Sequence, residues 1–332
     1  MSITLEDIAR MSGVSRSTVS RVVNGDPNVS ERTRARVQDV IQSVNFHPNI
    51  AARGLAAGRT HVLGLVIPTG VAAIFADPYF PLVIQGVSAA CNARGYSVML
   101  WLAEPEYERK TINQILSSSL IDGVVVSSML MDDPLLERLS ESSRPFVTIG
   151  RHPTNDKINY VDVDNRSGAY QGVTYMLRRG RRRVAIINGP ENTIASCDRY
   201  QGYHDALRER GLPLLEELAD RGDFADAAAY QAMKRLLPHR PDGVFATSDA
   251  MAMAAMRAIR EAGLRIPQDI AVLGFDDIPP AANSNPPLTT IRQPIQRTGS
   301  VAAEMLIDLI ERPDPQPRRV VLPTELVIRA SC

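Results

Sequence analysis

Residues 4–25 read TLEDIARMSGVSRSTVSRVVNG. Thr4 and Ser15 are residue types that cap helix N-termini, and Gly13 suits a tight turn between two helical segments. Each segment carries an apolar stripe at helical spacing, formed by Leu5, Ile8 and Ala9 in the first and by Val19, Val22 and Val23 in the second. The stretch therefore predicts two short amphipathic helices that pack across each other, a helix-turn-helix.

The second predicted helix has a polar face opposite its valines. This face consists of Arg16, Ser17, Thr18, Ser20 and Arg21. Guanidinium and hydroxyl groups donate hydrogen bonds to base edges and phosphates, so this helix has the character of a DNA recognition helix. Thr4, Ser15 and Asn24 flank it and complete the expected DNA contacts of this region. A third helix after Ser30 closes the core with Val37, Val40, Ile41 and Val44.

Charge supports this interpretation. Residues 1–60 hold eight arginines against five carboxylates, whereas the whole chain balances 37 basic with 37 acidic residues. Positive charge is thus concentrated where a phosphate backbone would lie. The alternative is a small structural or protein-docking bundle, because short helical pairs are common.

A second segment with a predicted DNA role begins two residues after Pro48 and reads Ile50-Ala51-Ala52-Arg53-Gly54-Leu55. It is shorter than the roughly 12 to 15 residues at which isolated helices become marginal, and an interior glycine costs about 1 kcal/mol relative to alanine. We expect it to fold only on DNA, with Leu55 as an apolar wedge in the minor groove. The expected DNA contacts of this segment are Asn49, Ala52, Arg53 and Leu55. The alternative is a flexible tether with no DNA role.

Beyond Thr60 the pattern changes to alternating apolar strands and amphipathic helices, which is typical of α/β folds. The predicted strands are Val62–Ile67, Ser97–Leu102, Gly123–Ser127, Phe146–Ile149, Val184–Ile187, Val244–Thr247 and Ile270–Phe275. The predicted helices are Pro81–Arg94, Tyr107–Ser118, Ser167–Arg179, Arg199–Arg210, Ala250–Ala262 and Ile295–Ile310. This series occurs twice, so it predicts two doubly wound lobes, with residues 160–164 and 291–294 as bridges between them.

At this point the chain resembles the LacI/GalR transcriptional regulators. The resemblance rests on the helix-turn-helix run, on Pro48 through Gly58, and on motifs such as Ile121-Asp122-Gly123, Asp249-Ala250-Met251-Ala252 and Leu273-Gly274-Phe275-Asp276-Asp277. It implies a small all-α helix-turn-helix headpiece plus an α/β periplasmic-binding-protein-like effector domain of two doubly wound lobes. It also implies that Leu55, paired with its copy in a second subunit, opens the central base step of a palindromic operator.

These observations predict three parts of the chain: a headpiece over residues 1–46, a hinge over 47–59, and an effector-binding and dimerisation domain over 60–332. Within the last part we expect an N-lobe at about 60–160 and 294–318, and a C-lobe at about 161–293 and 319–332.

Ligands in such sheets bind at the carboxyl ends of strands, so the loops there should carry the effector site. In the C-lobe those loops hold Ser248, Asp276 and, at the start of a predicted helix, Arg199, and the family resemblance implies that these three contact effector. Phe224 is a candidate lid. The N-lobe adds Asp77, Tyr79, Phe80, Trp101, Ser127 and Arg151. A tryptophan and a Tyr-Phe pair suit stacking on a sugar, although Trp101 in the core is an equal alternative.

The remaining features exclude other classes. No apolar run approaches a membrane span and no signal sequence is evident, so we expect a cytoplasmic protein. Three scattered cysteines exclude a disulfide scaffold, and five scattered histidines show no metal spacing. No catalytic motif is found, so the sequence predicts no enzyme, cofactor or metal.

We therefore expect a homodimeric, ligand-responsive repressor that binds double-stranded operator DNA and a small effector, most readily a carbohydrate. Gly150-Arg151 stands where some family members have an aspartate, so the individual sugar cannot be carried over. A repressor responding to a nucleobase or another metabolite is the first alternative, and a cytosolic sugar-processing enzyme is the alternative from a different class. The sign of the response and the choice between dimer and tetramer stay open.

Overall fold

The computed structural model describes residues 3–23, 25–46, 59–68, 70–102, 108–127, 130–131 and 134–332. The chain divides into two compact units, Met1–Thr60 and His61–Cys332, each with its own core. The predicted DNA contacts Asn24, Asn49, Ala52, Arg53 and Leu55 lie outside the described residues.

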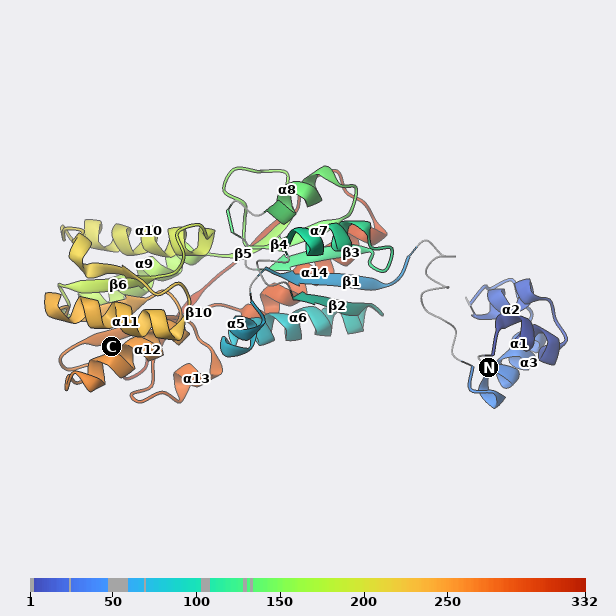
Figure 1. Ribbon diagram of the computed structural model, residues 1–332, viewed down its shortest axis with the longest axis horizontal. Coiled ribbons are helices and arrows are strands. Elements are labelled where there is room, and N and C mark those ends of the chain that lie inside the picture. The colour runs from blue at the N-terminus through green and yellow to red at the C-terminus, as the bar shows by residue number, and fades with distance from the viewer. Residues whose placement is uncertain are drawn as a thin grey trace. The chain divides into compact units, whose positions relative to one another are not determined.

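The first unit contains the predicted helix-turn-helix followed by a third helix (Figure 1). Its helices are α1 (Leu5–Ser12), α2 (Arg16–Val23) and α3 (Glu31–Ser43). The Thr4 hydroxyl accepts the Asp7 N–H while the Asp7 carboxylate accepts the Thr4 N–H, and Gly13 ends α1 in the left-handed region at φ 62°. Ile8, Val19 and Val37 are fully buried at the centre of the three helices. The predicted three-helix core is confirmed.

The second unit begins with a six-stranded parallel sheet in the order β11-β5-β4-β3-β1-β2. Its strands are β1 (Val62–Ile67), β2 (Ser97–Leu102), β3 (Gly123–Ser127), β4 (Phe146–Ile149), β5 (Tyr160–Val163) and β11 (Arg319–Leu322). One face packs on α6 (Tyr79–Ala93) and α14 (Ile295–Glu311), the other on α7 (Glu108–Ser117) and α8 (Pro134–Glu141). Alternating residues of β1 serve the two faces, with Leu63 and Leu65 on the first and Val66 on the second. A short helix, α5 (Val71–Ala76), follows β1.

The other six-stranded sheet has the order β12-β10-β9-β8-β6-β7, and only β12 runs antiparallel among the described strands. Its strands are β6 (Val184–Asn188), β7 (Ala219–Arg221), β8 (Gly243–Ala246), β9 (Ala271–Asp276), β10 (Thr289–Arg292) and β12 (Glu325–Val327). Helices α9 (Asn165–Arg178) and α10 (Ile194–Glu209) cover one face, while α11 (Asp226–Leu236) and α12 (Asp249–Glu261) cover the other (Figure 1). A short α13 (Pro279–Ala282) follows β9.

The chain passes between the two sheets three times, after β5, after β10 and after β11. This corrects the expected lobe boundaries, because residues 161–163 and 319–322 belong to the first sheet and not to the C-lobe. The segments expected as bridges, 160–164 and 291–294, are mostly strand: β5 closes one sheet and β10 extends the other before the chain crosses. The expected boundaries place the third crossing at residue 318, whereas the chain crosses only after Leu322. Neither β11 nor β12 is predicted as a strand, since both are short, half-exposed edge strands with little apolar signal.

The predicted elements otherwise match closely. The strands β1 to β4 have the predicted bounds, whereas α10 begins five residues earlier than expected, at Ile194. Arg199 therefore lies inside this helix and not at its first turn. Within the described part of the chain, no helix has the length and apolarity that a bilayer crossing requires.

Candidate functional site

The polar face of α2 is presented to solvent. Arg16, Ser17 and Arg21 are exposed, whereas Thr18 and Ser20 are half-buried. The Ser15 hydroxyl accepts the Thr18 N–H at 3.2 Å and so starts the helix. Ser15 and Thr4 thus shape the two helix starts as well as lying among the predicted DNA contacts.

Both arginines of this face have acidic neighbours. Arg16 Nε lies 2.6 Å from Glu6 Oε1, and Arg21 Nε lies 3.8 Å from Asp26 Oδ2. The side chains of Arg16 and Glu6 are 68% and 62% exposed, so this ion pair contributes only about 0–1 kcal/mol. Such weak pairs can be exchanged for phosphate contacts at little cost.

In the second unit, Arg199 is the buried cation among the carboxyl ends of the second sheet. Its Nε donates to Asn165 Oδ1 at 2.8 Å, and one terminal nitrogen donates to the Thr247 carbonyl at 2.6 Å. The guanidinium lies 3.7 Å from the centre of the Phe275 ring, so it is also stacked. Burial lowers the pKa of Arg199, and the Asp276 carboxylate opposes that shift. The side chain is therefore fixed in position by the protein alone.

Asp276 ends β9 beside this arginine. It is 4% exposed, one carboxylate oxygen lies 3.7 Å from a terminal nitrogen of Arg199, and the same oxygen accepts Gln293 Nε2 at 2.5 Å. Burial raises its pKa from 3.8 to about 7, the Arg199 charge counteracts this, and Asp77 adds to it. A buried carboxylate next to a fixed guanidinium can accept hydrogen bonds from the hydroxyl groups of a ligand in a defined direction.

This burial predicts a pH dependence of stability. Asp276 takes up a proton near pH 7 in the folded chain but only near pH 3.8 when unfolded, so its contribution to stability is present at low pH and is lost as pH rises through about 7. We therefore expect the difference in Tm, wild type minus Asp276→Asn, to decrease as the pH is raised from about 5 to about 8, because the amide of the variant does not titrate. Thermal denaturation measures this. A difference that stays flat over the range would contradict the burial of a charged group.

The lobe built on the first sheet contributes residues from the start of α6 and the loop before it. The Asp77 carboxylate accepts the Tyr79 N–H at 3.0 Å, and burial raises its pKa while the Arg199 charge lowers it. Burial also raises the pKa of Tyr79, and the Asp276 carboxylate adds to that effect. Phe80 is buried and packs edge-to-face on Tyr79 at 5.4 Å between ring centres. Asp77 and Tyr79 thus join the electrostatic environment of Arg199 and Asp276, from the other lobe.

Arg151, which follows β4, bridges the two lobes. It makes a bidentate ion pair with Asp198 of α10, in which one of the two contacts measures 2.7 Å. The same guanidinium lies 3.3 Å from Asp162 Oδ2 of β5. The Leu130–Thr193 bridge and the hydrogen bond from the Met131 N–H to the Asn192 carbonyl, at 2.7 Å, also join the lobes. Sequence reasoning predicted Arg151 as an effector contact but did not identify its carboxylate partners.

Three of the other predicted effector residues lie in loops or at strand ends, and one lies in the core. Ser127 is fully buried at the end of β3, Ser248 caps α12 by accepting the Met251 N–H, and the Phe224 ring lies over Gly189. Trp101 instead packs over Gly64 with the core cluster under α7 and α8, the alternative that the sequence left open.

Two buried polar atoms at strand ends have no hydrogen-bond partner among the described residues, namely Ser127 Oγ and Asn188 Oδ1. Buried polar atoms are nearly always paired, so such atoms suit a bound polar molecule. Sequence reasoning missed Asn188, together with Asn165, Asp198 and Gln293. The only feature these four residues share in the sequence is that each is a polar residue at the end of a strand or in a helix that packs on the sheet. Such residues are frequent in any chain, so this feature does not single them out.

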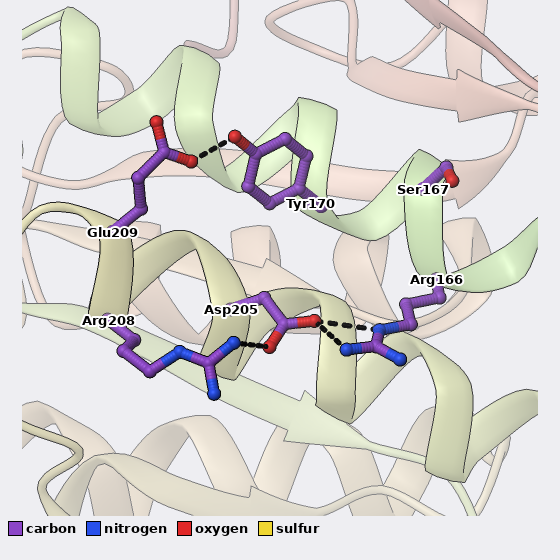
Figure 2. A pocket seen from close by; sticks show the side chains of 6 residues that line it. All are labelled: Arg166, Ser167, Tyr170, Asp205, Arg208 and Glu209. Carbon is purple, nitrogen blue, oxygen red and sulfur yellow. Dashed lines mark hydrogen bonds and ion pairs between the residues drawn. The ribbon is translucent and has the colours of Figure 1, made fainter.

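A groove of about 540 Å³ lies elsewhere, between α9 and α10 (Figure 2). Its lining comprises Arg166, Ser167, Tyr170, Asp205, Arg208 and Glu209. Figure 2 shows that the charged groups pair with one another, with Asp205 between the two arginines and Tyr170 against Glu209. None of the predicted effector residues lines this groove. In the part of the chain that the structure describes, no group of His, Cys, Asp and Glu side chains suits a metal ion.

Comparison with known proteins gives two family matches. Residues 4–49 match the model for bacterial regulatory proteins of the lacI family, and residues 173–332 match the periplasmic binding protein-like domain. The HTH-type transcriptional regulator CelR of Thermobifida fusca is 38% identical over 332 residues, which is 99% of this chain and 98% of CelR.

Solved structures agree with these matches. The CelR-cellobiose complex has a TM-score of 0.79 at 35% identity, covering 99% of this chain and 100% of the other. The lac repressor dimer bound to operator and the anti-inducer ONPF has a TM-score of 0.87 at 26% identity, covering 100% of this chain and 99% of the other.

Proposed function

This chain belongs to the LacI family of bacterial regulatory proteins, and on that premise we propose that it is a repressor that binds a palindromic operator as a homodimer under the control of a sugar. Palindromic DNA requires a two-fold symmetric protein. The observation that carries the sugar assignment is the buried Arg199–Asp276 pair, which directs a fixed donor and a fixed acceptor to one place at the strand ends.

The proposed site takes its groups from both lobes. Arg199, Asp276 and Ser248 would contact the effector from the C-lobe, with Gln293 and Asn188 added to the set that the sequence indicated. Asp77, Tyr79, Phe80, Ser127 and Arg151 would approach from the N-lobe, and Phe224 would serve as a lid. Ser127 Oγ and Asn188 Oδ1, for which the described residues offer no hydrogen-bond partner, support a polar ligand.

The proposed DNA surface is the exposed face of α2 with Thr4, Ser15 and Asn24 around it, completed by Asn49, Ala52, Arg53 and Leu55 of the hinge. We retain the parts 1–46, 47–59 and 60–332 as a proposal; the two compact units Met1–Thr60 and His61–Cys332 support a boundary near residue 60. The protein would act in the cytoplasm, where operator DNA is found, and not as an enzyme.

A gel shift on a palindromic duplex over a series of salt concentrations tests the DNA half of this proposal, because phosphate contacts make binding salt-dependent. A thermal-shift screen with cellobiose, D-ribose, other mono- and disaccharides and purines tests the effector half, since a ligand that binds only the folded state raises its stability. A response to purines alone would favour the nucleobase alternative. Turnover of a sugar without DNA binding at low salt would favour the enzyme and reject the repressor.

Replacing Leu55 with Ala should weaken binding to the specific operator strongly and leave salt-driven binding to random DNA nearly unchanged. The reason is that an apolar wedge contributes only where the minor groove opens, whereas phosphate contacts are independent of sequence. Gel shifts on operator and on scrambled duplexes measure the two affinities. Equal losses on both duplexes would reject the wedge.

A further inference from the structure

Asp249 is a fully buried carboxylate in which both oxygens are already engaged by the chain itself. Oδ1 accepts the Thr290 hydroxyl at 2.5 Å, and Oδ2 accepts the Ile278 N–H at 2.9 Å. The first contact reaches β10 and the second reaches the start of α13. One side chain therefore joins the loops that follow β8 and β9 to the neighbouring strand β10.

The backbone around Asp249 extends this arrangement to the proposed effector contacts. The Asp249 N–H donates to the Asp276 carboxylate and helps to counter the rise of its pKa. Two residues earlier, the Thr247 carbonyl accepts the guanidinium of Arg199. The segment 247–249 thus holds both members of the Arg199–Asp276 pair.

The turn that carries Asp276 needs such support, because its backbone lies in an unfavourable region. Asp276 and Asp277 have φ values of 125° and 57°, which side-chain-bearing residues rarely adopt. Strained residues of this kind persist only where the surroundings determine them. Asp249 fixes the turn from the far side, at Ile278, while Arg292 and Arg329 hold the Asp277 carboxylate.

Gly274 of β9 shows how closely Asp249 approaches this strand. A Cβ at Gly274 would lie 2.2 Å from Asp249 Oδ1, so no side chain fits between them. Glycine is therefore required where the carboxylate crosses the strand.

Resting on the proposed function, we infer that Asp249 is a positioning residue of the effector site: it does not bind effector but holds the Asp276 turn, and with it the acceptor opposite Arg199. Its loss should release the turn from the left-handed conformation and move the Asp276 carboxylate away from Arg199.

The test compares two variants of the full chain with cellobiose as the probe. Asp249→Asn can still accept the Ile278 N–H and donate to Thr290 Oγ, so it should bind cellobiose within about threefold of the wild type. Asp249→Ala loses both contacts and should bind about 10- to 100-fold more weakly, measured by calorimetry, with operator affinity unchanged. Equal affinities of the alanine variant and the wild type would overturn the inference.

A double-mutant cycle separates positioning from general destabilisation. If Asp249 acts through Asp276, the double variant Asp249→Ala/Asp276→Asn should bind cellobiose less than about twofold more weakly than Asp276→Asn alone. Full additivity would overturn the inference. The matched control is Asp242→Ala, which removes a carboxylate that accepts the N–H groups of Arg182 and Arg183 at 2.7 and 2.9 Å, away from the proposed site. It should leave cellobiose affinity unchanged.

A ligand-free measurement keeps the inference separate from the effector assignment. In a crystal structure of Asp249→Ala, Asp276 should leave its φ of 125°, and the distance of 3.7 Å to Arg199 should lengthen. An unchanged turn would refute the positioning role. If the wild type fails to bind cellobiose and every other sugar, the sugar assignment fails, and this structure still decides the role of Asp249.

Discussion

Replacing Asp276 with Asn should abolish the effector response and leave operator binding intact. Asp276 is 4% exposed, accepts Gln293 Nε2 and faces Arg199 at 3.7 Å. An amide in its place keeps one acceptor oxygen, and its NH₂ group would confront the donors of Arg199 or Gln293. Losing a charge-assisted hydrogen bond in a buried site costs about 1.5–3 kcal/mol, so effector affinity should fall roughly 10- to 150-fold.

The measurement is a gel shift on the operator with and without the sugar that stabilises the wild type in the thermal-shift screen. The control is Asp242→Asn, a loss of carboxylate charge away from the site, which should respond as the wild type does. If the sugar changes the affinity for DNA by some factor, DNA must change the affinity for the sugar by the same factor. Calorimetry of sugar binding with and without operator therefore gives a second measurement. A retained response would remove Asp276 from the site.

Replacing Ile8 with Ala should eliminate operator binding and leave sugar binding unchanged. Ile8 is fully buried against Val19 and Val37 in a core built from three short helices. Truncating a buried isoleucine costs about 2–5 kcal/mol, which is comparable to the whole stability of so small a unit. The headpiece should unfold and operator affinity should fall at least about 100-fold, whereas the separate core of His61–Cys332 is untouched.

Gel shifts and sugar calorimetry on the same preparation test this separation. Met11→Ala provides the control in the same helix, since Met11 is 47% exposed and its loss opens no cavity. Simultaneous loss of sugar binding in Ile8→Ala would show that the two units do not fold independently.

The sequence predicted most of the regular structure of this chain because helix caps and apolar runs are local properties. Thr4, Gly13 and Ser15 mark the helix boundaries of the headpiece, and the apolar runs of β1 to β4 have the bounds that the structure shows. The sequence predicted neither β11 nor β12 as a strand, and it assigned the residues of β11 to the wrong lobe. Strand pairing is a contact between distant segments, and these half-exposed edge strands carry little apolar pattern.

The candidate site shows the same division. Family motifs indicated Arg199 and Asp276, but not Gln293, which follows the neighbouring strand β10 and donates to Asp276 from there. Trp101 was a candidate for stacking on a sugar because it ends a strand, yet its ring packs over Gly64. Which face of a sheet a strand-end residue joins depends on register, and a single residue cannot reveal it.

The sequence by itself determined that this protein has a helix-turn-helix, two lobes of parallel sheet and a set of polar residues at strand ends, because each follows from spacing within one segment. Only the tertiary structure decided which of those residues meet. Arg151 pairs with Asp198, 47 positions away in the sequence, and Asp249 at the start of α12 holds the turn that carries Asp276. Burial and the charges of partners then set the pKa of Asp276, and both are products of packing between segments that the sequence lists far apart.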